Sequence, residues 1–209
     1  MWQSRRRLSP RGAKQQRGVV TAERLLDAAL AVYAEDPERL SVQAVISRSG
    51  VSLGSLYHHF GSLDGLAAAL YARCMDELLG ALVAALRRTR TARTGIHAVV
   101  AAYLDFAAAR PHAARFLHAS AYAGFLPPRA DAVAAAKAPG LDALLAWLDA
   151  RVRAGEIVPL PPELLEMLII GPPAETVRRW LAGTPGLSLD EARRVLPARV
   201  WASVAAQAP

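Results

Sequence analysis

The sequence predicts an all-α protein, and three observations lead to this fold class. Alanine, the residue with the highest helix propensity, is abundant throughout the 209 residues. Apolar residues recur at intervals of three or four, as they do along one face of a helix. No segment shows the alternation of apolar and polar residues that is typical of a β-strand. With 53% hydrophobic and 21% charged residues, the chain is expected to fold around a core.

The N-terminal part is predicted to begin with a basic arm, followed by a first helix. Residues 1–18 hold six basic and no acidic residues, together with a proline and two glycines, so we expect a flexible arm. Thr21 is predicted to cap a helix in which Leu25, Ala29 and Val32 share one face. A Pro residue at position 37 ends this helix.

Two short helices joined by a glycine turn are predicted next. Ser41 is a candidate N-cap for a helix that ends at Gly50. Ser52 is a candidate N-cap for a second helix that ends at Gly61. A helix, a tight turn and a second short helix over about residues 41–60 form a helix-turn-helix pattern.

A long helix is expected from Ser62 to about Arg88, because leucine or cysteine recurs at every fourth residue along it. The segments that we expect to be helical after it are 95–110, 111–124, 129–154, 163–183 and 188–207. Three of them contain internal prolines. These predict a break or kink at Pro139, a kink at Pro172 and Pro173, and a bend at Pro197.

The segment Gly50-Val51-Ser52-Leu53-Gly54 also fits the G-x-S-x-G pattern of a serine hydrolase. A nucleophile elbow requires a strand before the serine and a helix after it. The residues before Gly50 are predicted to be helical, so we interpret Ser52 as a helix cap and predict no catalytic residue. We expect the protein not to be an enzyme.

Charge and cysteine content limit the class of partner. The net charge of +7 and a pI of about 10.3 suggest a polyanionic partner, either nucleic acid or an anionic membrane surface. Cys74 is the only cysteine, which excludes an intrachain disulfide and a cysteine zinc cluster. No secretory signal or membrane-spanning run is evident, so a cytoplasmic location without membrane insertion is expected.

Residues 24–70 resemble the N-terminal DNA-binding domain of TetR-type transcriptional repressors. The most specific part is SGVSLGSLYHHF, residues 49–60, which is similar to the turn and recognition helix of that family. The resemblance implies a basic arm over 1–18, a helix-turn-helix domain over 19–65 and a helical ligand-binding and dimerisation domain over 66–209. It also implies a homodimer that binds a palindromic double-stranded operator and responds to a small apolar or amphipathic ligand, without cofactor or metal.

The resemblance places several polar residues of the helix-turn-helix at DNA. The predicted DNA-binding residues are Ser41, Gln43, Ser52, Leu53, Gly54, Ser55, Tyr57, His58 and His59. A tyrosine hydroxyl and imidazole N–H groups are suitable phosphate donors, and a glycine lets the helix approach the bases closely. Leu53 departs from the polar residue common at its position, and it can offer only apolar contact, for example to a thymine methyl. Val51, Leu56 and Phe60 are expected in the core.

The C-terminal part carries weaker signals. Its aromatic and methionine residues could line an apolar pocket or belong to plain core. The predicted pocket residues are Tyr71, Met75, Tyr103, Phe106, Phe116, Tyr122, Phe125, Trp147 and Met167. Trp180 and Trp201 are candidates for a dimer interface, although an intrachain contact explains them nearly as well.

Two other functions stay open from the sequence. A basic helical protein could bind a membrane surface, although its basic residues gather in a tail rather than along an amphipathic helix. The protein could also be an orphan DNA-binding regulator that has no small-molecule ligand.

Overall fold

The computed structural model of the chain describes residues 10–120 and 126–206. The contacts divide the chain into two units, Met1–Leu70 and Tyr71–Pro209. Within the described ranges the chain is helical, apart from one isolated bridge between Ile157 and Ala205. The prediction of an all-α fold is therefore confirmed. In the same ranges, no helix combines the length and apolar character that crossing a lipid bilayer requires.

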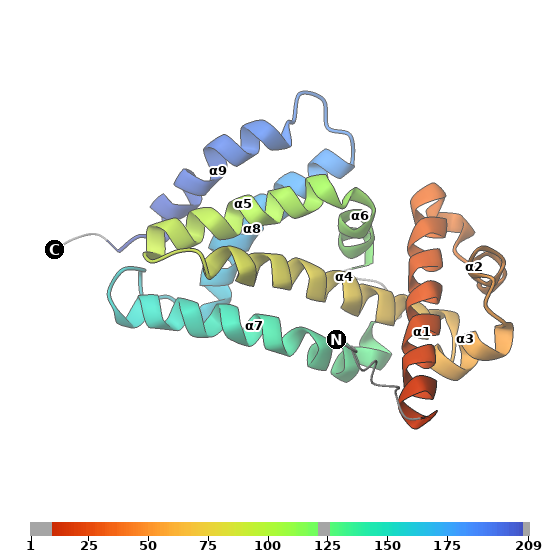
Figure 1. Ribbon diagram of the computed structural model, residues 1–209. Helices are drawn as coiled ribbons and strands as arrows, with labels where there is room; N and C mark the ends of the chain where they lie inside the picture. The colour runs from red at the N-terminus through yellow and green to blue at the C-terminus, as the bar shows by residue number, and fades with distance from the viewer. Residues whose placement is uncertain (1–9, 121–125, 207–209) are drawn as a thin grey trace, which may run out of the picture. The chain divides into compact units, whose positions relative to one another are not determined.

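From residue 10 on, where its description begins, the first unit is built from three α-helices and the start of a fourth (Figure 1). Its elements are α1 (Pro10–Glu35), a short 3-10 helix η1 (Pro37–Arg39), α2 (Val42–Ser49), α3 (Leu53–Phe60) and the first turns of α4 (Leu63–Leu86). Leu25, Val45 and Leu56 are completely buried, and they bring α1, α2 and α3 around a common core. This core orients α3, because Leu56, the buried residue of α3, fixes which side of the helix faces outward.

Helix α1 is longer than expected. It begins at Pro10, so residues 10–18 are helical rather than part of the predicted arm. Thr21 does not cap the helix, and its hydroxyl donates to the carbonyl of Arg17 at 2.9 Å within the helix. A proline suits the first position of a helix, and single glycines weaken a helix by only about 1 kcal/mol each. The remainder of the predicted arm, residues 1–9, lies outside the described residues.

The described residues of the second unit, 71–120 and 126–206, form the rest of α4 and five further helices, with one 3-10 turn between two of them (Figure 1). The elements are α5 (Ala92–Ala109), α6 (Pro111–Ser120), η2 (Pro127–Arg129), α7 (Ala130–Arg153), α8 (Pro162–Leu181) and α9 (Leu189–Val204). Helix α5 packs against α6, α8 and α9. Ile96, Leu104, Phe116 and Val177 are among the fully buried core residues.

The internal prolines do not break their helices. Helix α7 continues through Pro139, α8 through Pro172 and Pro173, and α9 through Pro197. Of the break or kink predicted at Pro139, the break is therefore wrong, and the kink stays a prediction. A proline removes one backbone hydrogen bond, and tertiary packing can offset that loss. Pro173 and Pro197 are indeed buried.

Candidate nucleic-acid interface and apolar pocket

The turn between α2 and α3 is held by serine caps and a left-handed glycine. The Ser41 hydroxyl accepts from the Ala44 N–H at 3.3 Å, at the start of α2. Gly50 ends α2 with a φ of 64°, a conformation that glycine adopts without strain. The Ser52 hydroxyl accepts from the Ser55 N–H at 3.3 Å. Ser52 is thus a helix cap between two helices, and this segment is not a strand-turn-helix nucleophile elbow.

Arg24 of α1 fixes the same turn from outside it. One guanidinium nitrogen donates to the carbonyl of Ser49 at 2.7 Å, at the C-terminal end of α2. The hydroxyl of the buried Ser49 in turn accepts from the Val51 N–H at 3.2 Å. Neither Arg24 nor Ser49 was predicted to have a role, because the two are 25 residues apart and no local pattern joins them.

Helix α3 buries one side and exposes the other. Leu56 is fully buried, whereas Leu53 and Tyr57 are 47% and 49% exposed. Gly54 and His58 are exposed as well. Exposed apolar and aromatic side chains that gather on one side of a helix can mark an interaction surface. The exposed side of α3 therefore forms a candidate interface.

The other predicted DNA-binding residues lie around this surface. Ser41, Gln43 and Ser52 are exposed, and Ser55 and His59 are partly buried. Val51 and Phe60, which were expected in the core, are also only partly buried. The rings of His58 and His59 are 5.2 Å apart, so the two side chains stay close neighbours at the end of α3.

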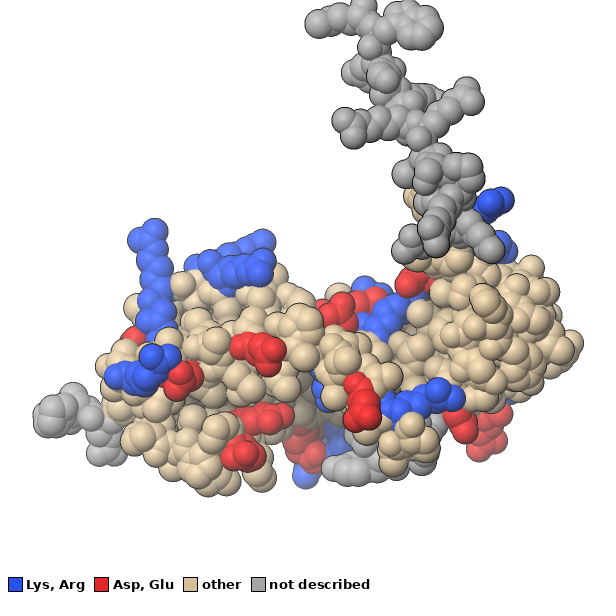
Figure 2. Space-filling model, turned by 90° about the horizontal axis from the view of Figure 1, so that it is seen from below, with Lys and Arg blue, Asp and Glu red and all other residues tan. Residues whose placement is uncertain are grey.

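Positive charge is scarce over residues 16–70 of the first unit. Residues 16–70 contain four arginines and six acidic residues, and α3 has neither a lysine nor an arginine. Figure 2 shows mostly uncharged surface on the α1–α3 side of the face in view. Residues 1–15, in contrast, contain five basic and no acidic residues. Helix α1 passes beside α3 near this basic stretch, because a Cβ atom on Gly18 would lie 3.8 Å from the His59 ring.

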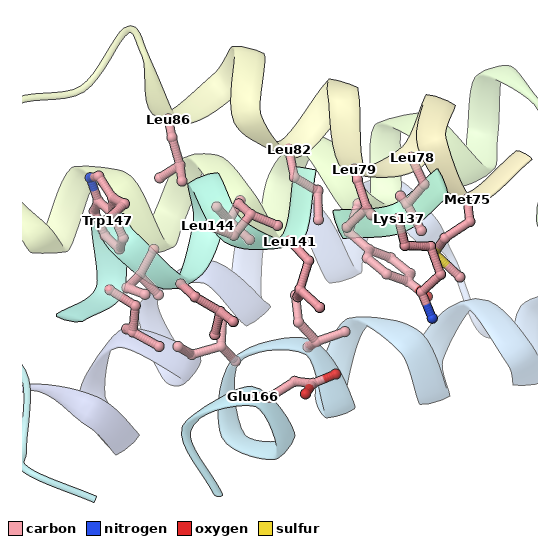
Figure 3. A pocket seen from close by; sticks show the side chains of 17 residues that line it. Met75, Leu78, Leu79, Leu82, Leu86, Lys137, Leu141, Leu144, Trp147 and Glu166 are labelled. Carbon is pink, nitrogen blue, oxygen red and sulfur yellow. The ribbon is translucent and has the colours of Figure 1, made fainter. Parts of the chain in front are cut away.

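The second unit contains an apolar pocket of about 380 Å³ between four helices (Figure 3). This volume lies within the range of small-molecule sites. Helix α4 contributes Met75, Leu78, Leu79, Leu82 and Leu86. Helix α7 contributes Lys137, Leu141, Leu144, Leu145, Trp147 and Leu148. The remaining lining residues are Ile96, Val99 and Tyr103 of α5 and Glu166, Ile169 and Ile170 of α8.

Three of the nine predicted pocket residues, Met75, Tyr103 and Trp147, line this pocket. Tyr71, Phe106 and Phe116 are buried elsewhere in the second unit, and Met167 is 67% exposed on α8. Tyr122 and Phe125 lie outside the described residues. The prediction missed the leucines of α4 and α7, because a pocket-lining leucine repeats at the same spacing as a core leucine.

Helix α7 approaches its neighbours through two glycines. A Cβ atom on Gly95 of α5 would lie 2.1 Å from the Trp147 ring, and one on Gly140 would lie 2.7 Å from the Cβ atom of Leu79 on α4. Most of α7 is otherwise exposed, and Val133 is its one buried residue. The helix covers one side of the pocket while making few buried contacts.

A polar pair lies at the pocket wall. The Tyr103 hydroxyl is 3.4 Å from Nε2 of His118 on α6. Burial raises the pKa of Tyr103 to about 12, so that its hydroxyl stays protonated. Burial also lowers the pKa of His118 below its ordinary value of 6.5, and Arg178 lowers it further while Glu175 raises it. His118 is therefore neutral in the folded protein at neutral pH.

The lowered pKa of His118 predicts that the folded protein loses stability in mild acid. Below about pH 6.5 the unfolded chain binds this proton more readily than the folded chain does. The loss begins near 6.5 and is complete below the lowered native pKa. Each unit between the two pKa values contributes about 1.4 kcal/mol. Urea unfolding between pH 8 and 5 should show a steeper loss for wild type than for His118→Gln, and equal slopes would contradict the assignment.

Trp180 and Trp201 lie on α8 and α9, which pack against each other. Both are partly buried within the single chain. The described ranges hold no group of three or more His, Cys, Asp or Glu side chains arranged to bind a metal ion.

A family model agrees with this geometry. Residues 25–70 match the model of bacterial regulatory proteins of the tetR family, and this segment includes the α2–turn–α3 region. No curated protein sequence matches the chain significantly.

Several solved structures have the same fold. A TetR family transcription regulator from Marinobacter aquaeolei VT8 is 22% identical with a TM-score of 0.74, over 92% of this chain and 100% of that one. A protein of unknown function from Rhodococcus sp. RHA1 is 22% identical with a TM-score of 0.73, over 99% and 100%. The regulator FadR from Bacillus subtilis, in complex with stearoyl-CoA, is 20% identical with a TM-score of 0.68, over 85% and 96%. At these identities the likeness concerns the fold.

Proposed function

We propose that this protein, whose residues 25–70 match the model of bacterial regulatory proteins of the tetR family, is a ligand-responsive transcriptional repressor. In this proposal it binds a palindromic operator as a homodimer, with α3 of each protomer in one major-groove half-site. The observation that carries the proposal is the outward side of α3. It combines the exposed Leu53, Gly54 and Tyr57 with a core contact through Leu56 that fixes the helix.

The chemistry of this surface favours DNA over a membrane. Tyr57, His58 and the serine hydroxyls are hydrogen-bond donors suited to phosphates and base edges. Gly54 leaves room for close approach, because nothing lies within 4 Å of the position of a Cβ atom there. A membrane-binding helix would instead carry basic residues along one face, and α3 has no lysine or arginine.

The apolar pocket supports the ligand-responsive part of the proposal. Helix α4 begins at Leu63, three residues after α3 ends, and its later turns from Met75 to Leu86 line the pocket. A ligand that shifts α4 would change how the reading helices are presented and so lower operator affinity, and DNA would lower ligand affinity by the same factor. One structural neighbour, FadR from Bacillus subtilis, was solved with stearoyl-CoA, which agrees with an apolar ligand in this fold.

The proposed dimer would use α8 and α9. Trp180 and Trp201 lie on these helices, and large aromatic residues often anchor interfaces. Exposed apolar side chains on the same helices, among them Leu164, Met167 and Val195, add surface that a partner protomer would cover.

A gel-shift titration with Tyr57→Ala tests the DNA-binding proposal. The probe is the DNA upstream of the protein's own gene, with excess non-specific DNA at roughly physiological salt. We expect a discrete dimer-sized shift for wild type. Affinity should fall roughly fivefold to a hundredfold for Tyr57→Ala, because loss of a ring and a hydroxyl from the interface is worth about 1–3 kcal/mol.

Tyr33→Phe on α1 is the control, because the Tyr33 side chain is buried and so does not reach the exposed surface that would contact DNA. If no specific site emerges from this promoter or from random-site selection, the proposed function is wrong. If Tyr57→Ala binds as wild type does, α3 is not the reading helix.

A further inference from the structure

We propose that the pocket binds a linear acyl chain whose anionic head group pairs with Lys137. This inference rests on the proposed ligand-responsive function and names the class of ligand. Three features carry it: the elongated shape of the pocket, its apolar lining, and the position of one lysine at one end.

The pocket is long because two of its walls run side by side. On α4 the lining residues extend from Met75 to Leu86, about 16 Å along the helix axis. On α7 they extend from Lys137 to Leu148, also about 16 Å. The two helices touch where Gly140 meets Leu79. A volume of about 380 Å³ spread over this length suits an unbranched chain better than a bulky ring system.

The lining has almost no hydrogen-bonding groups. Four of the 17 lining residues have an oxygen or nitrogen atom in the side chain. They are Tyr103, Lys137, Glu166 and Trp147. A polar or multiply hydroxylated ligand would lose its hydrogen bonds to water here without replacement. A hydrocarbon chain would instead gain from burial at each methylene group.

Lys137 gives the pocket a direction. In Figure 3, Lys137 lies at the same end as Met75, whereas Trp147 lies at the end of Leu86. Lys137 is partly buried and has no hydrogen-bond or ion-pair partner in the described part of the chain. Glu166 is exposed, so water can solvate its carboxylate. Of the two charged side chains at the pocket, Lys137 is the more buried, so its ammonium group gains more from a partner of opposite charge, and this favours an anion.

An acyl chain with an anionic head could be a free fatty acid or a fatty-acyl thioester with a phosphate-bearing carrier. In the first the carboxylate pairs with Lys137, and in the second a phosphate does. The chain then runs along α4 and α7 towards Leu86 and Trp147 in both cases. The two sources share this chemistry and are separated by experiment.

Calorimetric titration of the full chain with a series of twelve-carbon ligands, kept monomeric in solution, tests the inference. The ligands are dodecanoate, dodecanoyl-CoA, dodecanol and dodecylamine. We expect the tighter of the two anionic ligands to bind at least about tenfold more strongly than the neutral alcohol, as a charge-assisted hydrogen bond provides. The tighter of the two anions identifies the source.

Variants at Lys137 separate charge from packing. Lys137→Met should remove the preference for the anion while leaving the affinity for dodecanol unchanged, and Lys137→Arg should keep the preference. Arg153→Met is the matched control on α7, because Arg153 is exposed, pairs with Asp149 and does not line the pocket. It should bind all four ligands as wild type does.

Three results would overturn the inference: no binding of any chain, equal affinity for dodecanoate, dodecanoyl-CoA and dodecanol, or tighter binding of dodecylamine. An unchanged preference in Lys137→Met would also overturn it. The proposed function fails separately. If the anionic chain binds but operator affinity does not change, the ligand class holds and ligand-responsive repression does not. If the wild type shifts operator DNA but no chain binds, the inferred ligand class is wrong, while the proposed DNA binding stands.

Discussion

Gly54→Leu will reduce operator affinity by roughly a hundredfold or more, while the protein stays folded. Gly54 is exposed in the first turn of α3, and no atom lies within 4 Å of where its Cβ would be. A leucine there meets nothing within the protein, and it replaces a poor helix former with a good one. In a complex with DNA, however, the side chain would hold α3 away from the base edges. Losing two base contacts of about 1–3 kcal/mol each accounts for the expected change.

The measurement is a gel-shift titration at fixed salt, accompanied by urea unfolding of the same protein samples. Gly54→Ala should give an intermediate loss, since one methyl group displaces the helix less. Gly80→Leu on α4 is the matched control, because Gly80 is also an exposed helical glycine with nothing within 4 Å. Binding of operator by Gly54→Leu within about threefold of wild type would show that the exposed side of α3 does not approach DNA.

Gly95→Ala will destabilise the protein by about 1–3 kcal/mol, as overpacking commonly does. The new methyl carbon would lie 2.1 Å from the Trp147 ring, so the ring and the adjoining part of α7 must move. Elsewhere a glycine-to-alanine change within a helix stabilises by about 0.5–1 kcal/mol. Gly80→Ala, on an open helix surface, should show that stabilisation. The two substitutions are chemically identical and are expected to have opposite signs.

A double-mutant cycle identifies the cause of the effect. Trp147→Ala removes the ring that the new methyl group would strike. Adding Gly95→Ala to this background should therefore be neutral or stabilising in urea unfolding. If Gly95→Ala is equally destabilising with and without Trp147, the contact between α5 and α7 does not explain the glycine.

Local chemistry made much of the first unit predictable. The caps at Ser41 and Ser52 and the left-handed Gly50 follow from residue type and position within a few neighbouring residues. Local residue type also led to a wrong start for α1. Thr21 is a residue type that often caps helices, but here it lies within the helix. Whether a threonine caps depends on whether the preceding residues are already helical, which a single position does not reveal.

The second unit was less predictable, because its site depends on contacts between distant segments. The leucines of α4 repeat as core residues do, and only the position of α7 turns some of them into pocket walls. Lys137 and Leu79 are far apart in sequence, and no motif joins them. The hydrogen bond from Arg24 to the Ser49 carbonyl was not predicted either, because these two residues are also distant in sequence. The aromatic residues chosen as pocket candidates include Phe116, which is fully buried in the core, because aromatic size alone does not distinguish the two environments.

Basic residues are unevenly distributed in the first unit, and this separates non-specific binding to DNA from recognition of the operator sequence in the proposed function. Five of the basic residues precede position 16, whereas α3 carries none. In the proposed function, the N-terminal segment would then supply most of the counterion release that keeps the protein sliding on any DNA, and α3 would only decide where it stops. Losing or neutralising that segment would weaken non-specific binding, so that the protein slides a shorter distance before it dissociates. The preferred operator sequence would not change. Selection could therefore adjust the residence time on DNA and the operator sequence independently.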